Sequence, residues 1–424
     1  MFVNALKSVQ NLTDTREHVK NYRPKILVLT GNPAHRPPLV DFANLLTKKL
    51  SLLICGHVVT EPGSIQLAVL KESTQKWLFD KKIKGFYAVT ENSSFEEGGK
   101  SCLTLTGLGK LSPNLLLMGF KTNWKDNLDS SSQYFNILEA AFDQAYSVAI
   151  LRVRSGFDFS DHIKAVETED AHDDDEMIGA VGDDIEDYST RSNSREGEKT
   201  NDGVPEMMKQ NINRQRTRTI SRSVYTDNQG NPVSKDVILD LNQFQRAKRN
   251  GTIDVWWLYD DGGLTLLLPY ILTTRQQFSG CQLRVFSLAN RKDELDRETR
   301  NMAALLAKFR IEFSSVIVIP HITKRAKDET MNVFKGILES LPEGTVTEEE
   351  LLENKEKTNR HLRLCELLQE HSNEAEMIMI TLTLPRKKQV SAPLYLAWLD
   401  IMTRGLPPTL LIRGNQSSVL TFYS

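Results

Sequence analysis

The sequence has little cysteine and lacks long apolar runs. Its 4 cysteines in 424 residues are too few for a disulfide scaffold, and such usage is typical of a reducing compartment. The densest apolar stretch, Leu264–Leu272, is interrupted by Pro269, whereas a membrane-spanning helix needs about 20 apolar residues. We therefore expect this polypeptide to be soluble and cytosolic, with its cysteines as buried thiols.

Patterns of catalytic and metal sites are also missing. The sequence contains no H-E-x-x-H, no C-x-x-C and no G-x-S-x-G, and its 8 histidines show no ligand spacing. A large excess of one charge is absent too, since 53 basic side chains stand against 55 acidic ones. The sequence predicts no enzyme, no metal site and no nucleic-acid partner.

The charge balance hides one segment of unusual composition. From Ala165 to Thr190 there are 11 acidic residues and no Lys or Arg, and from Arg191 to Arg222 there are 8 basic and 4 acidic residues. A segment this charged and this poor in apolar side chains does not gain enough from burial to offset its ordering entropy. We predict a disordered linker at 165–235.

On either side of this linker, continuous apolar runs alternate with helical patterns. Strands are expected at 25–31, 51–59, 83–90, 114–120, 147–153, 252–259, 281–288, 314–320, 376–385 and 408–414. Helices are expected at 37–50, 64–81, 95–106, 131–145, 264–278, 293–308, 325–340, 347–371 and 391–403. Apolar strands without alternation are typical of parallel sheets covered on both faces. The fold class is α/β, with two doubly wound, mostly parallel-sheet halves, the first at 21–164 and the second at 236–424, as two sheets packed together.

The two ends of the chain have apolar patterns of their own. Val3, Leu6, Val9 and Leu12 lie on one face of a predicted helix within residues 1–20, which suits packing on a partner. The last residues, 419–423, are apolar, and we expect them to form an edge strand of the sheet.

The first strand-to-helix turn holds the candidate nucleotide or phosphate site: Gly31, Asn32 and Arg36. Open α/β sheets bind phosphates at this edge through backbone N–H groups, and an arginine can pair with a phosphate. No G-x-G-x-x-G and no Walker lysine motif is present, so plain turn chemistry is the favoured alternative and no cofactor is predicted.

Two further motifs have both a functional and a structural interpretation. Asp260 and Asp261 precede two glycines, and they are either Mg²⁺ ligands or, as we favour, the cap and turn of the following helix. In the linker, Thr217, Thr219 and Ser221 each have Arg three residues before them. They are candidate sites for basophilic kinases, and the alternative is a solvated basic stretch.

Eight stretches together resemble one family: 17–42, 50–59, 82–89, 106–121, 251–272, 284–314, 394–402 and 406–424. They are similar to the cytoplasmic C-terminal domain of the cation–chloride cotransporters. The segments DDGGLT and VLTFYS resemble the sodium-dependent branch, especially the sodium–potassium–chloride cotransporters. The similarity covers nearly the whole chain except the linker.

The resemblance implies properties that the residues alone do not. It implies two halves similar to the universal stress protein fold, a homodimer at the cytoplasmic face of the plasma membrane, and an attached transmembrane transport domain that this domain modulates. Residues 1–20 become the membrane-proximal connecting helix of a fragment cut after the last membrane helix. Some family members have nucleotide in this domain, and Gly31 and Arg36 stand in the corresponding turn.

Three alternatives remain open. The chain is a sodium–chloride or a potassium–chloride member instead, a free nucleotide-sensing protein of the universal stress type, or an α/β enzyme. Transported ions are not predicted, because the ion-binding residues of the family lie in transmembrane helices.

Overall fold

The computed structural model describes residues 1–15, 18–60, 67–162, 233–289, 295–320, 322, 324–384 and 389–420. All of them belong to one compact unit. The predicted linker up to residue 232, with Thr217, Thr219 and Ser221, lies outside the described residues, so those predictions stay predictions.

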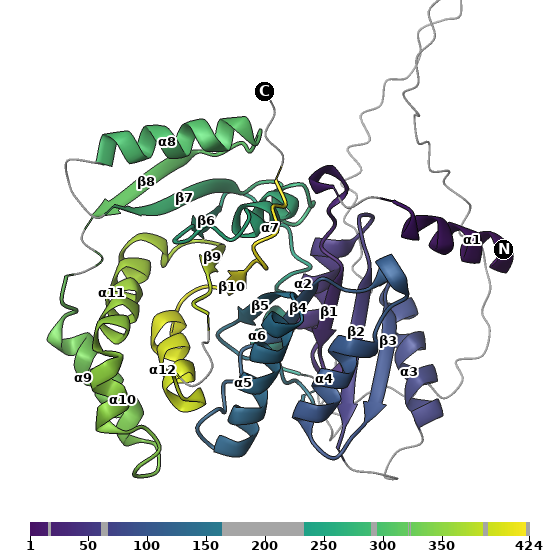
Figure 1. Cartoon of the computed structure of the whole chain (residues 1–424), viewed down its shortest axis with the longest axis horizontal. Coiled ribbons are helices and arrows are strands. Elements are labelled where there is room, and N and C mark those ends of the chain that lie inside the picture. Colours follow the sequence, from purple (N-terminus) through teal and green to yellow (C-terminus); the bar gives the residue numbers. More distant parts are fainter. Residues whose placement is uncertain are drawn as a thin grey trace, which may run out of the picture. The chain divides into compact units, whose positions relative to one another are not determined.

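Strands from both halves form a single sheet (Figure 1). The strands of the first half are β1 (Ile26–Leu29), β2 (Leu53–Val59), β3 (Phe86–Glu91), β4 (Leu115–Gly119) and β5 (Ser147–Arg152). Those of the second half are β6 (Thr252–Trp256), β7 (Gln282–Ala289), β8 (Ser315–Pro320), β9 (Met377–Thr381) and β10 (Thr409–Arg413). The predicted strands are thus present, most with shorter bounds, while β7 has the expected length and is shifted by one residue.

The order of the strands shows that the second half repeats the first. The sheet runs β3-β2-β1-β4-β5-β10-β9-β6-β7-β8. In each half the first strand lies between the second and the fourth, and all neighbours are parallel except β5 and β10. These two pair antiparallel, with Ile150 opposite Leu411. A pseudo-two-fold relation between the halves passes through this pair.

The prediction of two separate sheets is wrong, whereas the doubly wound, mostly parallel α/β class is confirmed. Each half ends with a short apolar strand that would otherwise be a sheet edge. Residues Val148, Ile150, Leu410 and Leu411 of these two strands are fully buried. Pairing the strands satisfies their backbone groups and removes both edges at once.

Helices cover both faces of the sheet. One face carries α2 (Pro37–Thr47), α3 (Leu67–Asp80), α6 (Lys235–Leu241), α7 (Leu264–Thr273) and α8 (Leu295–Lys308). The other carries α4 (Phe95–Leu105), α5 (Leu128–Asp143), α9 (Asp328–Glu339), α11 (Lys355–Ser372) and α12 (Ala392–Thr403). In β1, Ile26 and Val28 face the first core and Leu27 and Leu29 the second. Burial on both faces explains the continuous apolar runs of the sequence.

Three local predictions need correction. The expected helix 347–371 is divided into α10 (Glu348–Glu353) and α11, because the chain leaves helical geometry at Asn354. Helix α6 lies at the expected end of the linker and was not predicted. The apolar end forms no edge strand through residue 420, since both neighbours of β10 are already strands and the sheet edges are β3 and β8.

The N-terminal helix α1 (Phe2–Thr13) is present and has no buried residue. Phe2 and Val3 are 80% and 58% exposed. The Lys110 ammonium group donates a hydrogen bond to the Thr15 carbonyl and links this segment to the first half. The boundaries proposed for the connecting helix and the two halves stay predictions.

Candidate functional site

The turn after β1 brings the predicted residues Gly31, Asn32 and Arg36 together at the carboxyl edge of the first half. Gly31 has φ +64°. The Arg36 side chain folds back over it, and Nη1 donates to the Thr30 carbonyl at 2.6 Å. A Cβ at residue 31 would lie 2.9 Å from that nitrogen. Glycine therefore provides both the backbone conformation and the room for the guanidinium.

The polar side chains of this turn bind other groups of the protein. The Asn32 Oδ1 atom accepts a hydrogen bond from the Ala34 N–H at 3.1 Å and caps the 3-10 turn Pro33–His35. The Arg36 Nη2 atom lies 3.6 Å from a carboxylate oxygen of Asp158. Turn chemistry accounts for these contacts, as the sequence interpretation favoured, and the nucleotide prediction remains untested.

Two basic residues that the sequence interpretation missed lie at the same edge. Lys121 follows β4, which neighbours β1 at the point where the strand order reverses, and His57 lies in β2. Burial lowers the pKa of Lys121, and the charge of Arg36 lowers it further. Burial, then Arg36 and His35, lowers the pKa of His57 to about 4, so that its imidazole is neutral at pH 7. The position of Lys121 just after a predicted strand was the available signal.

In the second half, the corresponding turn contains a carboxylate that already accepts hydrogen bonds from other groups of the protein. Asp261 is fully buried. Its carboxylate accepts hydrogen bonds from the N–H groups of Gly263, Thr265 and Gly414, each at 3.2 Å, and from the Thr265 hydroxyl at 2.7 Å. Burial raises the pKa of Asp261, and these donors oppose the shift. The predicted cap is correct in part: the N-cap residue of α7 is Gly263, but the Asp261 carboxylate accepts from the Thr265 N–H in the first turn of the helix.

Asp260 is exposed and also stabilises this turn. Its Oδ1 atom accepts a hydrogen bond from the Gly262 N–H at 3.0 Å. Gly262 and Gly263 have φ +80° and +90°, values that favour glycine. Within the described part of the chain, no group of three or more His, Cys, Asp or Glu side chains could hold a metal ion.

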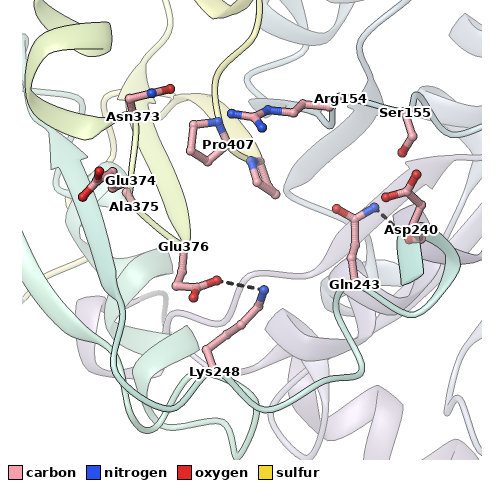
Figure 2. A pocket seen from close by; sticks show the side chains of 11 residues that line it. Arg154, Ser155, Asp240, Gln243, Lys248, Asn373, Glu374, Ala375, Glu376 and Pro407 are labelled. Atoms are coloured by element: carbon pink, nitrogen blue, oxygen red, sulfur yellow. Dashed lines mark hydrogen bonds and ion pairs between the residues drawn. The ribbon is translucent and has the colours of Figure 1, made fainter. Parts of the chain in front are cut away.

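A polar pocket of about 360 Å³ lies where the two halves adjoin (Figure 2). It is lined by Arg154 and Ser155 after β5, by side chains from α6 and the loop that follows it, and by residues before β9 and β10. The Lys248 Nζ atom lies 2.8 Å from a carboxylate oxygen of Glu376. The pocket lining includes Ser155, Asp240 and Glu374 but no His or Cys.

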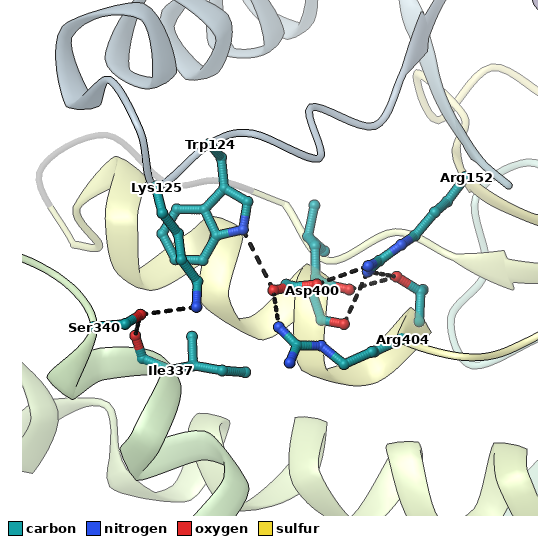
Figure 3. A network of polar contacts seen from close by, with 9 residues as sticks. Trp124, Lys125, Arg152, Ile337, Ser340, Asp400 and Arg404 are labelled. Atoms are coloured by element: carbon teal, nitrogen blue, oxygen red, sulfur yellow. Dashed lines mark hydrogen bonds and ion pairs between the residues drawn. The ribbon is translucent and has the colours of Figure 1, made fainter. Parts of the chain in front are cut away.

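A buried polar network joins the halves on the other side of β5 (Figure 3). Asp400 of α12 is at its centre, 2.7 Å from Arg152 and 2.5 Å from Arg404. The Trp124 indole N–H donates to the same carboxylate at 3.4 Å. Burial alone would raise the pKa of Asp400, but the hydrogen bonds and charges of Arg404 and Arg152 hold it below its ordinary value.

All four cysteines are free and buried, as predicted. Burial raises the pKa of Cys55 to about 12 and that of Cys102 and Cys365 to about 11. Thiolates therefore do not form at these sites near neutral pH.

A sequence model of solute carrier family 12 matches residues 36–424. The chain belongs to solute carrier family 12. It is 39% identical to a bumetanide-sensitive sodium-(potassium)-chloride cotransporter of Manduca sexta, and the match covers 100% of this chain and 43% of that protein. Solute carrier family 12 member 2 of Squalus acanthias is 34% identical and member 1 of Homo sapiens 36%, again over 100% of this chain, with 38% and 40% of those proteins covered.

This family 12 chain therefore spans about two fifths of the length of the curated relatives it matches. The family predicted from the sequence is confirmed, and the Manduca sexta relative is by name a sodium-dependent member. Among solved structures, the cytoplasmic domain of a prokaryotic cation chloride cotransporter overlaps 94% of this chain and 99% of its own, at 9% identity and a TM-score of 0.45. No helix in the described ranges is long and apolar enough to cross a membrane.

Proposed function

We propose that this chain is the cytosolic regulatory and dimerisation domain of an electroneutral sodium–potassium–chloride cotransporter. It would lie at the cytoplasmic face of the plasma membrane and modulate the transport of chloride with cations for cell volume and chloride homeostasis. The observation that carries the proposal is the match of the whole chain, at 39% identity, to a protein named as a sodium-(potassium)-chloride cotransporter.

The proposed partners are an attached transmembrane transport domain, a second copy of the chain and regulatory kinases. Helix α1 supports the first of these, because Phe2, Val3 and Leu6 are exposed and the helix has no buried residue. Such an apolar stripe is typical of a helix that packs on another element. The kinases would act in the linker, at Thr217, Thr219 or Ser221.

We propose further that the domain is not an enzyme. The polar side chains at the carboxyl edges of both halves serve turns, helix caps and ion pairs, as Asp261 and Arg36 do. Two folded halves at 21–164 and 236–424 would form a platform that transmits changes to the membrane through residues 1–20.

A chimera tests the transport assignment. The part of the Manduca sexta cotransporter that matches this chain is replaced by residues 1–424, and bumetanide-sensitive rubidium uptake is measured in cells. Uptake close to that of the parent protein supports the proposal. A chimera that reaches the cell surface at parental levels without such uptake contradicts it. The matched control is the same chimera lacking residues 1–20, which should reach the surface and lose regulated uptake.

Sedimentation tests the dimer. The isolated chain should sediment as a dimer at micromolar concentration, and the distribution should shift toward monomer on dilution. A monomer throughout this range would exclude an autonomous dimerisation domain, whatever the outcome for transport.

The carboxyl edge of the first half supports a second, smaller proposal. Arg36 and Lys121 lie close enough there for the charge of one to lower the pKa of the other. An anion such as a nucleotide phosphate would relieve that repulsion.

A further inference from the structure

The carboxyl edge of the second half is occupied by the chain itself. The strand order reverses there between β6 and β9, and open α/β sheets take their ligands at such a point. Residues 414–420 leave β10 at this edge and pass the turn before α7. Figure 1 shows the segment in yellow, running from β10 past α7. The position of a ligand is therefore filled by a peptide.

Two backbone hydrogen bonds hold this segment at its two ends. The Gly414 N–H donates to the buried carboxylate of Asp261 at 3.2 Å, and the Val419 N–H donates to the Gly262 carbonyl at 2.9 Å. Between and beyond them the segment belongs to no helix or strand through residue 420. The segment bends at Gln416, which has φ +68°, and the Ser417 N–H donates to the Asn415 side chain at 3.1 Å. Asn415 itself donates to the Ser147 hydroxyl at 3.3 Å and to the Ala145 carbonyl at 2.7 Å, so it stays attached to the first half.

Two adjacent aliphatic side chains fasten the end of the segment. Val419 and Leu420 are 6% and 8% exposed and belong to the core that covers one face of the sheet. Burial of these two side chains favours the bound position and opposes the entropy cost of ordering the segment.

The glycines of the turn leave room for the segment. A Cβ at residue 262 would lie 2.2 Å from the Ser417 carbonyl oxygen, and one at residue 263 would lie 2.7 Å from a methyl carbon of Leu420. The sequence interpretation assigned these glycines to the turn alone. Their second role is close approach of another stretch of backbone, which marks a surface shaped for a peptide.

The first half has a matching feature. The segment after β5 crosses the corresponding edge, where the Phe159 N–H donates to the His35 carbonyl at 2.9 Å and Phe157 and Phe159 are buried. There the turn is cationic, with Arg36 paired to Asp158. In the second half the turn is a buried carboxylate, which repels an anion. The two edges therefore differ in the class of ligand they favour.

We propose that the crevice formed by Asp261, Gly262 and Gly263 is a peptide-binding site whose resident ligand is residues 414–420. The site takes a segment with two adjacent aliphatic side chains, and release of residues 414–420 breaks no strand pairing. The inference does not depend on the proposed transport function.

Peptide binding to a shortened chain tests this. A chain ending at Asn415 is titrated with a synthetic peptide of residues 416–424 by calorimetry. Binding at one site per chain is expected. A control peptide carrying Val419→Asp and Leu420→Asp should bind more than about tenfold weaker, because it cannot bury the two side chains. The full chain should bind the unmodified peptide more than about tenfold weaker as well, since its crevice is filled. A folded shortened chain that does not distinguish the two peptides would overturn the proposal.

Hydrogen exchange on the full chain keeps the test independent of whether the shortened chain folds. The Val419 amide should exchange at least about tenfold faster than the Leu411 amide at the centre of β10, because a releasable segment opens locally. Equal exchange of the two amides would make residues 414–420 an inseparable part of the fold and would overturn the proposal.

Discussion

The guanidinium of Arg152 lies 2.7 Å from the carboxylate of Asp400 and joins the last strand of the first half to the last helix of the second. The same guanidinium donates to the Asp400 carbonyl at 2.9 Å and to the Thr403 hydroxyl at 2.8 Å. Its carbon lies 4.4 Å from the centre of the Phe120 ring. These side-chain contacts hold α12 against β5 and stabilise the antiparallel pair of β5 and β10 on one face of the sheet.

Removal of Asp400 should destabilise the chain strongly. Asp400→Ala leaves the Arg152 charge buried without its partner, and breaking a buried pair in this way costs about 3–5 kcal/mol. Arg404 also contacts Asp400 but is 46% exposed, so Arg404→Ala should cost less than about 1 kcal/mol. Urea unfolding followed by circular dichroism measures both. Equal losses of unfolding free energy for the two variants would contradict the inference that the buried pair of Arg152 and Asp400 holds the halves together.

His361 should make the chain sensitive to mild acid. Its ring stacks on Trp398 at 4.7 Å, and its nitrogens lie 2.7 Å from the Lys357 carbonyl and 3.1 Å from the Thr383 hydroxyl. Burial lowers the pKa of His361 from 6.5 to about 4. The unfolded chain therefore binds the proton first, and stability falls as the pH drops below 6.5 until it levels off below 4.

The expected loss from this residue between pH 7 and pH 5 is about 2 kcal/mol. His361→Phe keeps a ring for stacking but does not titrate. Between pH 7 and pH 5 its unfolding free energy should therefore fall by about 2 kcal/mol less than that of the parent chain. His18→Gln, a change at an exposed position, is the control and should follow the parent chain. Parallel pH profiles for the parent and His361→Phe would show that His361 does not contribute to the loss of stability in acid.

Much of the fold could be predicted because burial on both faces leaves a direct mark on the sequence. Ile26–Leu29 and Leu115–Gly119 are continuous apolar runs, and they form parallel strands as expected. Joining of the halves was not predictable, because the runs around Ile150 and Leu411 do not show whether they pair with each other or end two separate sheets. Which distant strands become neighbours depends on the packed structure, and the sequence of each strand alone does not show it.

For the candidate sites, too, local contacts could be predicted from the sequence and contacts between distant residues could not. The bond of Asp261 to the first turn of α7 was predicted, because its cause is local: a carboxylate and two glycines before a helix. The contact of Asp261 with Gly414 spans 153 positions, and no spacing rule indicates it. Lys121 was missed for a similar reason, since its relation to Arg36 depends on β1 and β4 being neighbours.

Asp41 should oppose His361 in the pH dependence of stability. It is 9% exposed on α2 and accepts a hydrogen bond from the Gln245 amide at 2.8 Å. Burial raises its pKa from 3.8 to about 6, while Gln245 and the charge of Lys81 oppose the shift. The folded chain therefore favours protonated Asp41, and stability from this group is present below pH 3.8 and lost as the pH rises through 6.

Asp41→Asn removes the buried charge and keeps an acceptor for Gln245. Above pH 7 this variant should be more stable than the parent chain by up to about 3 kcal/mol, and the difference should vanish near pH 4. Asp80→Asn, at an exposed position, is the control and should change stability little. Unfolding measured at pH 4 and pH 8 decides the matter, and an Asp41→Asn variant less stable than the parent at pH 8 would contradict it.

Anion binding at the first half should depend on both cations of its carboxyl edge. ADP is titrated into the full chain by calorimetry. Arg36→Ala and Lys121→Ala should each weaken binding by about tenfold, because each removes a charge-assisted contact to phosphate. Gly31→Ala should weaken it too, since the added Cβ would lie 2.9 Å from the Arg36 guanidinium and the residue has φ +64°. Arg154→Ala, in the pocket between the halves, is the matched control and should bind as the parent does. If ADP and inorganic phosphate both fail to bind the parent chain at millimolar concentration, the anion-site proposal is wrong and Arg36 serves only the turn and Asp158.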